Sequence, residues 1–156
     1  MGTDTTILWT TDLDTGIGVI DAQHKRIVDY INLLGEAIKE PNQAWVGTVL
    51  KELVDYTLSH FSFEESLQQE SGYTNAKTHK AVHELFVKRV GRYMEQHNAG
   101  EDVAQQLHTM LSTWLVQHIK RDDMDYIREA RSRISHIVQN KKEDNWLSRA
   151  LGKFFS

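Results

Sequence analysis

Four residues in the middle of the chain have the types and the spacing of a metal-binding cluster. His60 and Glu64 are four residues apart, His79 and His83 are again four apart, and a turn at Gly72 separates the two pairs. On an α-helix a spacing of four rotates a side chain by only about 40°, so each pair projects from one face. Two antiparallel helices would aim three imidazoles and one carboxylate into the space between them, which is a coordination shell suited to a transition metal.

Further residues extend this cluster along the chain. His24 lies on an apolar helical pattern between Ile20 and Ile27, and His118 lies on another, five residues before Asp123. Burying five imidazoles without partners costs on the order of several kcal/mol, so a structural role alone does not explain them. The candidate metal ligands are therefore His24, His60, Glu64, His79, His83, His118 and Asp123. The remaining histidines are expected at the protein surface: His97, His108 and His136.

The number and the chemistry of these ligands favour two metal ions. Seven ligands exceed the four of an ordinary zinc site, and two carboxylates are what two octahedral metals need as bridges. Nitrogen and oxygen donors suit iron, with manganese, cobalt or zinc as alternatives. The chain has no cysteine, which excludes thiolate metal sites, iron–sulfur clusters and disulfides.

The elements that must position these residues are helices. Apolar residues recur with helical period over residues 19–39, 44–70, 75–97 and 101–138, and the connections between these stretches are short. Asn42 is placed to cap the second stretch. Short connections favour antiparallel neighbours, so the predicted fold is all-α, an up-down-up-down four-helix bundle. Residues 1–140 form this domain, and residues 1–18 form an arm whose apolar residues pack on it.

The end of the chain is expected to form a separate amphipathic tail over residues 141–156. Its apolar residues have helical spacing, with Arg149 and Lys153 opposite Trp146 and Phe154. Such a helix either folds back over the bundle or, through residues 144–156, docks on a membrane surface or a protein partner. The sequence leaves both alternatives open.

Composition bounds the class of protein. At 156 residues the chain is long enough for one domain with one core, and 26% of its residues are charged. A net charge of −4 with both signs interspersed argues against nucleic-acid binding, which needs a basic stripe. No segment has the length of a membrane span, and the N-terminus lacks the pattern of a signal peptide, so a cytoplasmic location is expected.

The motifs resemble those of one family. D-A-Q-H near the N-terminus, followed by H-x-x-x-E, H-x-x-x-H and H-x-x-x-x-D, is similar to the pattern of hemerythrins, in particular bacterial hemerythrins. The resemblance covers about residues 9–130 and fills all seven ligand positions. The stretch after about Gln139 lies outside it.

The resemblance implies a non-haem di-iron centre that binds O2 reversibly. It assigns His79, His83 and His118 to one iron, and His24 and His60 to the other. Glu64 and Asp123 would bridge the two irons together with an oxo or hydroxo group derived from solvent, and the second iron would keep a position open for O2. Leu115, one turn before His118, would form an apolar wall of the O2 pocket; Ile20, Ile27, Phe63, Phe86 and Trp114 are further candidates.

The spacing of the last ligand conflicts with an ideal helix. Asp122 is four residues from His118 and stays within about 40° of it, whereas Asp123 at five residues lies about 140° away. The hemerythrin pattern nevertheless selects Asp123. One widened turn of the π type between residues 118 and 123 reconciles the two, because it absorbs the extra residue. The sequence thus predicts a helical irregularity at this position.

Three functions fit this pattern. The first is an O2-binding protein for storage, delivery or buffering, which is not an enzyme. The second is a sensor that signals O2 or redox state through a partner surface, with the apolar tail as its support. The third is an enzyme that handles peroxide or nitric oxide, which requires proton donors in the pocket.

Overall fold

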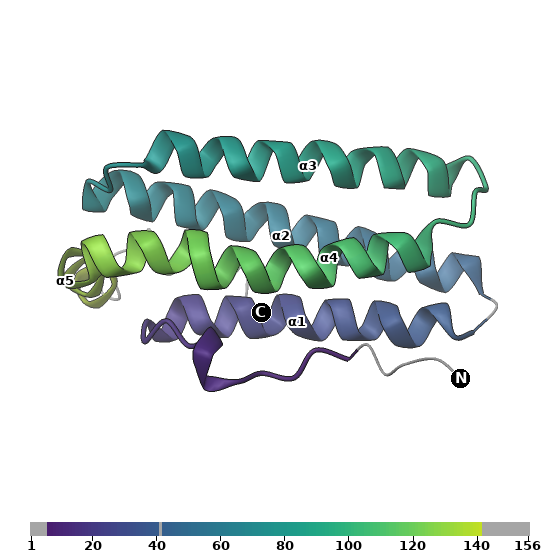
Figure 1. The fold of residues 1–156 in the computed structure, drawn as a ribbon, viewed down its shortest axis with the longest axis horizontal. Coiled ribbons are helices and arrows are strands. Elements are labelled where there is room, and N and C mark those ends of the chain that lie inside the picture. Colours follow the sequence, from purple (N-terminus) through teal and green to yellow (C-terminus); the bar gives the residue numbers. More distant parts are fainter. Residues whose placement is uncertain (1–5, 41, 142–156) are drawn as a thin grey trace.

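The computed structural model describes residues 6–40 and 42–141, with side chains up to residue 139. Four long helical segments lie side by side along the bundle axis and alternate in direction (Figure 1). The helices are α1 (Gly18–Ile38), α2 (Gln43–Ser71), α3 (Ala76–Asn98), α4 (Ala104–His118) and α5 (Met124–Lys141). A π-helical turn (Ile119–Asp123) joins α4 to α5, and a short 3-10 helix, η1 (Thr11–Leu13), lies in the N-terminal arm. The predicted all-α four-helix bundle is confirmed.

Local signals explain where α2 begins and ends. The Asn42 side chain accepts a hydrogen bond of 3.0 Å from the backbone N–H of Trp45, which confirms the predicted N-cap. At the other end Gly72 has a φ of 71°, a left-handed conformation that suits glycine. The backbone N–H of Tyr73 then bonds to the carbonyl of Gln68 at 3.0 Å, which closes the helix end. The tight turn that follows aligns α3 against α2.

The N-terminal arm packs on the bundle, as its apolar residues predict. The backbone of Ile7 exchanges two hydrogen bonds with the Asn32 side chain of α1, at 2.8 and 3.0 Å. Leu13 of η1 is buried. Its neighbour Asp12 forms an ion pair of 2.7 Å with Lys120 on the π-turn. The arm therefore reaches the turn that carries Asp123.

The fourth helical segment, expected over residues 101–138, consists of α4, the π-turn and α5. It starts at Ala104, changes to π geometry after His118, and continues as α5, which Figure 1 shows turned nearly end-on at the end of the bundle. There α5 contacts the α2–α3 connection: Arg133 bonds to the Ser71 carbonyl, and Glu129 accepts a 2.8 Å hydrogen bond from the backbone N–H of Thr74. α5 thus closes one end of the bundle.

Two expectations concern parts of the chain outside this description. The amphipathic tail and its docking segment at residues 144–156 lie beyond the described residues, so the division at residue 140 stays a prediction. Among the described helices, none is long and apolar enough to cross a membrane.

Candidate metal centre

The seven candidate ligands converge inside the bundle. Each is at most 4% exposed. They come from all four helical segments: one from α1, two from α2, two from α3, one from α4 and one from the π-turn. In that order they are His24, His60, Glu64, His79, His83, His118 and Asp123. The sequence therefore predicted correctly that these side chains point inward, while their binding of metal stays a prediction.

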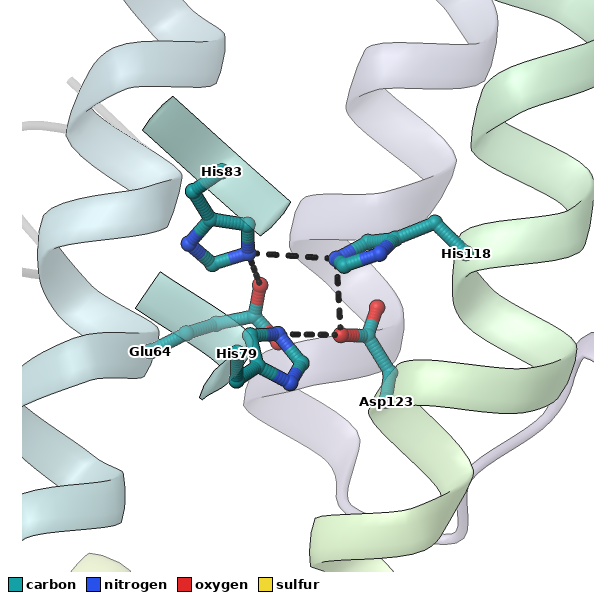
Figure 2. A group of neighbouring side chains, drawn as sticks. All are labelled: Glu64, His79, His83, His118 and Asp123. Carbon is teal, nitrogen blue, oxygen red and sulfur yellow. Dashed lines mark hydrogen bonds and ion pairs between the residues drawn. The ribbon is translucent and has the colours of Figure 1, made fainter. Parts of the chain in front are cut away.

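Glu64 lies between the imidazoles of α2 and α3. Its Oε1 atom is 2.8 Å from Nε2 of His60, four residues earlier on the same helix face, and 3.8 Å from Nε2 of His83. His83 Nε2 is in turn 3.1 Å from His118 Nε2. Figure 2 shows the rings of His79, His83 and His118 and the carboxylates of Glu64 and Asp123 directed toward one common space.

The carboxylate of Asp123 contacts imidazoles from three helical segments. Its Oδ1 atom lies 3.2 Å from Nε2 of both His79 and His118, and its Oδ2 atom lies 3.1 Å from Nε2 of His24. Figure 2 shows the contacts with His79 and His118. The carboxylate therefore faces both sides of the cluster.

The π-turn brings Asp123 to this position. Residues 119–123 have π geometry, which confirms the predicted irregularity between His118 and Asp123. Asp123 is fully buried in the cluster, whereas the side chain of Asp122 is 21% exposed and lies on the outer side of His118. A regular helix would have favoured Asp122 at the centre, so the widened turn decides which aspartate enters it.

The ligand atoms fall into two groups that share both carboxylates. One group contains Glu64 and Asp123 with three imidazoles, those of His79, His83 and His118. The other contains the same two carboxylates with two imidazoles, those of His24 and His60. Within each group one atom per residue lies within 4.8 Å of all the others. Five nitrogens and two shared carboxylates are a donor set for two adjacent metal ions.

Unpartnered polar atoms test whether this donor set fits a metal. Imidazole nitrogens lie near Glu64 Oε1 and both carboxylate oxygens of Asp123, yet these three oxygens form no hydrogen bond of acceptable geometry with any described residue. The same is true of Nε2 of His24 and His79. Buried polar atoms normally have a partner, and a metal ion is a partner that all of these atoms can share. The residues fit the metal ions that the resemblance implies.

The pKa shifts of the carboxylates follow from this crowding. Burial disfavours the charged form of Asp123, but the imidazole of His118 outweighs it and holds the pKa of this carboxyl well below its ordinary value. Burial and the charge of Asp123 act in the same way on Glu64, and His60 overcomes them, which lowers the pKa of Glu64 to about 2. Both carboxylates are thus ionised at neutral pH and ready to bind a cation.

The imidazoles differ from one another. Burial opposes a charge on His118, but Asp123 and Asp122 outweigh it and raise the pKa of His118 to about 10. His83 has no comparable carboxylate support, and burial lowers its pKa to about 3. In the metal-free cluster at neutral pH, His118 is therefore a charged imidazolium and His83 a neutral imidazole.

Contacts from outside the cluster hold two of the candidate ligands in place. Gln23 Oε1 lies 2.6 Å from Nδ1 of His60, and the hydroxyl of Tyr126 donates to Glu64 Oε2 at 2.5 Å. These contacts were missed at the sequence level. Gln23 belongs to the D-A-Q-H motif, and its polar side chain on a buried helix face was the available signal. Tyr126 had no signal, because its direction depends on the π-turn.

Aromatic rings cover the side of the cluster formed by α3 and α4. Phe61 stacks on His83 with ring centroids 3.8 Å apart, and Trp114 stacks on His118 at 4.2 Å. Phe86 stacks in turn on Trp114 at 3.9 Å. Phe86 and Trp114 were among the expected wall residues, and Phe61 was not. Leu115 is buried one turn before His118, and its place in an O2 pocket stays a prediction.

One of the three histidines expected at the surface is a core residue. His108 is 1% exposed, and burial lowers its pKa. It faces α1 beside Gly35, where an added Cβ would lie 3.0 Å from His108 Nε2, so glycine leaves the space that the ring fills. Its angle of about 80° from the face of His118 directs it to this neighbouring helix and not to solvent. His97 is partly buried, and His136 is exposed as predicted.

Comparison with known proteins agrees with this geometry. The hemerythrin family model, described as the hemerythrin HHE cation binding domain, matches residues 15–130, which contain all seven cluster residues. The chain belongs to the hemerythrin family. This confirms the resemblance drawn from the motifs, and the hemerythrin domain accounts for the described bundle up to the middle of α5.

Individual hemerythrins match most of the chain. Bacteriohemerythrin of Pseudomonas paraeruginosa is 49% identical over 149 residues, covering 96% of this chain and 97% of that protein. Bacteriohemerythrin of Stenotrophomonas maltophilia is 44% identical over the same shares. A crystal structure of wild-type hemerythrin superposes with a TM-score of 0.74 and 34% identity, over 77% of this chain and 94% of that one. Because the two sequence matches span 149 of 156 residues, they include part of residues 142–156.

Proposed function

We propose that this hemerythrin binds O2 reversibly at a non-haem di-iron centre and serves to store, deliver or buffer O2, without being an enzyme. The observation that carries the proposal is the sharing of Glu64 and Asp123 by a group of three imidazoles and a group of two. An arrangement of this kind would offer two metal ions two shared carboxylates and an unequal number of nitrogen donors.

The unequal donor count supports O2 as the ligand. When bound, the iron pair would supply two electrons to O2, and the ion held by His24 and His60 would have one imidazole fewer than the other ion. Membership of the hemerythrin family supports iron over manganese, cobalt or zinc in this donor set. The assignment of each residue to one ion follows the division seen in the geometry.

The protein's own residues favour reversible binding over further reaction. All seven cluster residues are shielded from solvent, and the rings of Phe61 and Trp114 cover His83 and His118. A water-poor pocket slows the loss of bound oxygen to side reactions. The buried hydroxyl of Tyr126 is a nearby proton donor, but its proton is already engaged by Glu64. An enzyme that reduces peroxide or nitric oxide requires a proton free to move to the substrate, so Tyr126 supports binding and not catalysis.

Anaerobic reconstitution tests the proposal. Metal-free protein is loaded with ferrous iron, and the iron content is measured per chain. The sample is then cycled between argon and air while its visible spectrum is recorded. We expect two irons per chain and a charge-transfer band that appears in air and disappears under argon over repeated cycles. Zinc-loaded protein is the control and should show no band. One metal per chain, or a band that does not reverse, would contradict the proposal.

A further inference from the structure

Both nitrogens of His118 face a carboxylate. Nε2 is 3.2 Å from Asp123 Oδ1 inside the cluster, and Nδ1 is 2.9 Å from Asp122 Oδ2 on its outer side. The imidazole is 2% exposed, so these contacts lie at the edge of the buried region and not in bulk solvent. The ring is therefore fixed from two sides by consecutive residues of the chain.

The π-turn makes this double contact possible. In a regular α-helix residue i+4 lies about 40° from residue i and residue i+5 about 140° away, so Asp122 and Asp123 could not both reach the imidazole of His118. Asp122 makes the i,i+4 contact with His118 that an ordinary helix allows. The widened turn adds the i,i+5 contact through Asp123. One local irregularity thus supplies both an inner carboxylate and an outer one.

The imidazoles of His60 and His83 have weaker support at their outer nitrogens. Nδ1 of His60 meets the neutral amide oxygen of Gln23 at 2.6 Å. Nδ1 of His83 is 3.6 Å from Glu65 Oε2, which is too far for a hydrogen bond, and has no other partner among the described residues. Among the described residues, the carboxylate in hydrogen-bond contact with the outer nitrogen of a cluster imidazole is that of Asp122, at His118 on the three-imidazole side.

We propose that Asp122 is a positioning residue for His118. By accepting the Nδ1 proton it fixes the tautomer whose Nε2 lone pair faces the cluster, and its charge makes that nitrogen a stronger donor. A stronger donor and an added negative charge stabilise the ferric state over the ferrous state. Asp122 therefore lowers the reduction potential of the three-imidazole iron. This inference rests on the proposed di-iron function and names a residue that tunes it.

Three variants separate the hydrogen bond from the charge. Asp122→Asn removes the charge and keeps an acceptor oxygen, while Asp122→Leu removes both. Glu65→Gln is the matched control, because Glu65 is also a partly exposed carboxylate, 26% against 21%, beside the outer nitrogen of a cluster histidine but without the hydrogen bond. The measurements are the metal content, the midpoint potential, the affinity of metal-free protein for Co²⁺ against a chelator, and the histidine ¹⁵N shifts of zinc-loaded protein.

We expect Asp122→Asn to keep two metals per chain and to raise the midpoint potential more than Glu65→Gln does. Asp122→Leu should lower Co²⁺ affinity by about 10- to 100-fold. The ¹⁵N shifts of the wild-type protein should show a proton on Nδ1 of His118. Equal shifts of potential in Asp122→Asn and Glu65→Gln would overturn the inference, whether or not Asp122→Leu folds. If the wild-type protein itself fails to bind two metals, the proposed function fails instead.

Discussion

The hydroxyl of Tyr126 on α5 donates a 2.5 Å hydrogen bond to Oε2 of Glu64 on α2, and both side chains are fully buried. This bond satisfies one oxygen of a carboxylate that both metal groups share. It also links α5, which follows the π-turn, to α2, which supplies the candidate ligands His60 and Glu64.

Replacing Tyr126 with phenylalanine leaves that Glu64 oxygen without its donor. Because the acceptor is charged and buried, we expect the metal-free protein to lose about 1.5–3 kcal/mol of unfolding free energy. Urea denaturation of the metal-free variant measures this loss. Tyr93→Phe, on a partly buried tyrosine of α3, is the control and should change stability less. Equal losses for the two variants would show that the bond to Glu64 contributes nothing specific.

Replacing Asp123 with asparagine should remove both metals, because its carboxylate belongs to both groups. Asp122→Asn, one residue earlier, should keep both, since the amide oxygen still accepts from His118 and Asp122 is outside the two groups. Metal analysis of the purified variants distinguishes these results. Retention of metal by Asp123→Asn together with loss by Asp122→Asn would contradict the assignment of Asp123.

Shortening Leu115 to alanine should speed the decay of the oxygenated protein and leave its metal content unchanged, because Leu115 contributes no ligand and a smaller side chain admits water. The decay is followed as loss of the visible band in air. Leu107→Ala, at a fully buried position of the same helix, is the control for general loss of packing, which costs about 2–5 kcal/mol. Identical decay in both variants would mean that Leu115 serves only as core.

Metal binding to the metal-free protein should release a proton at pH 8. The neighbouring carboxylates raise the pKa of His118 to about 10, so at pH 8 its imidazole is protonated, and Nε2 must lose its proton before it binds a metal. Apparent metal affinity therefore rises with pH up to about 10. Titration with Zn²⁺ in weakly buffered solution containing a pH indicator measures the release. Affinity that is constant between pH 7 and 9 would contradict this prediction.

The parts of the centre that the sequence predicts are those set by helix periodicity. The pairs His60 and Glu64, and His79 and His83, each lie on one face because a spacing of four does so on any α-helix. The π-turn was predictable for the opposite reason, since a spacing of five fails on a regular helix. The π-turn at residues 119–123 confirms that the five-residue spacing of His118 and Asp123 indicated a departure from regular α-helical geometry.

The parts that the sequence does not predict depend on packing between helices. Asp122 was not among the candidate ligands, yet it contacts His118 from outside the cluster. His108 was expected at the surface because its angle was judged against His118 alone, while the space beside Gly35 on α1 determines its burial. The path of α5 across the end of the bundle depends on its contacts with the α2–α3 connection. None of these relationships is periodic along one helix.

The π-turn also sets the direction in which the later side chains, those of α5, point from the helix axis. One residue more than an α-helical turn needs is accommodated between His118 and Asp123, and a regular helix would rotate each later side chain by about 100°. Tyr126, Ile127, Ala130 and Ile134 are all buried in the phase that the widened turn produces. Deleting one residue from this turn would restore α-helical geometry and keep the later side chains in their present directions. A substitution that restored α-helical geometry without a deletion would rotate the apolar face of α5 toward water. The geometry of the candidate metal centre and the packing of α5 therefore depend on the same additional residue in the π-turn.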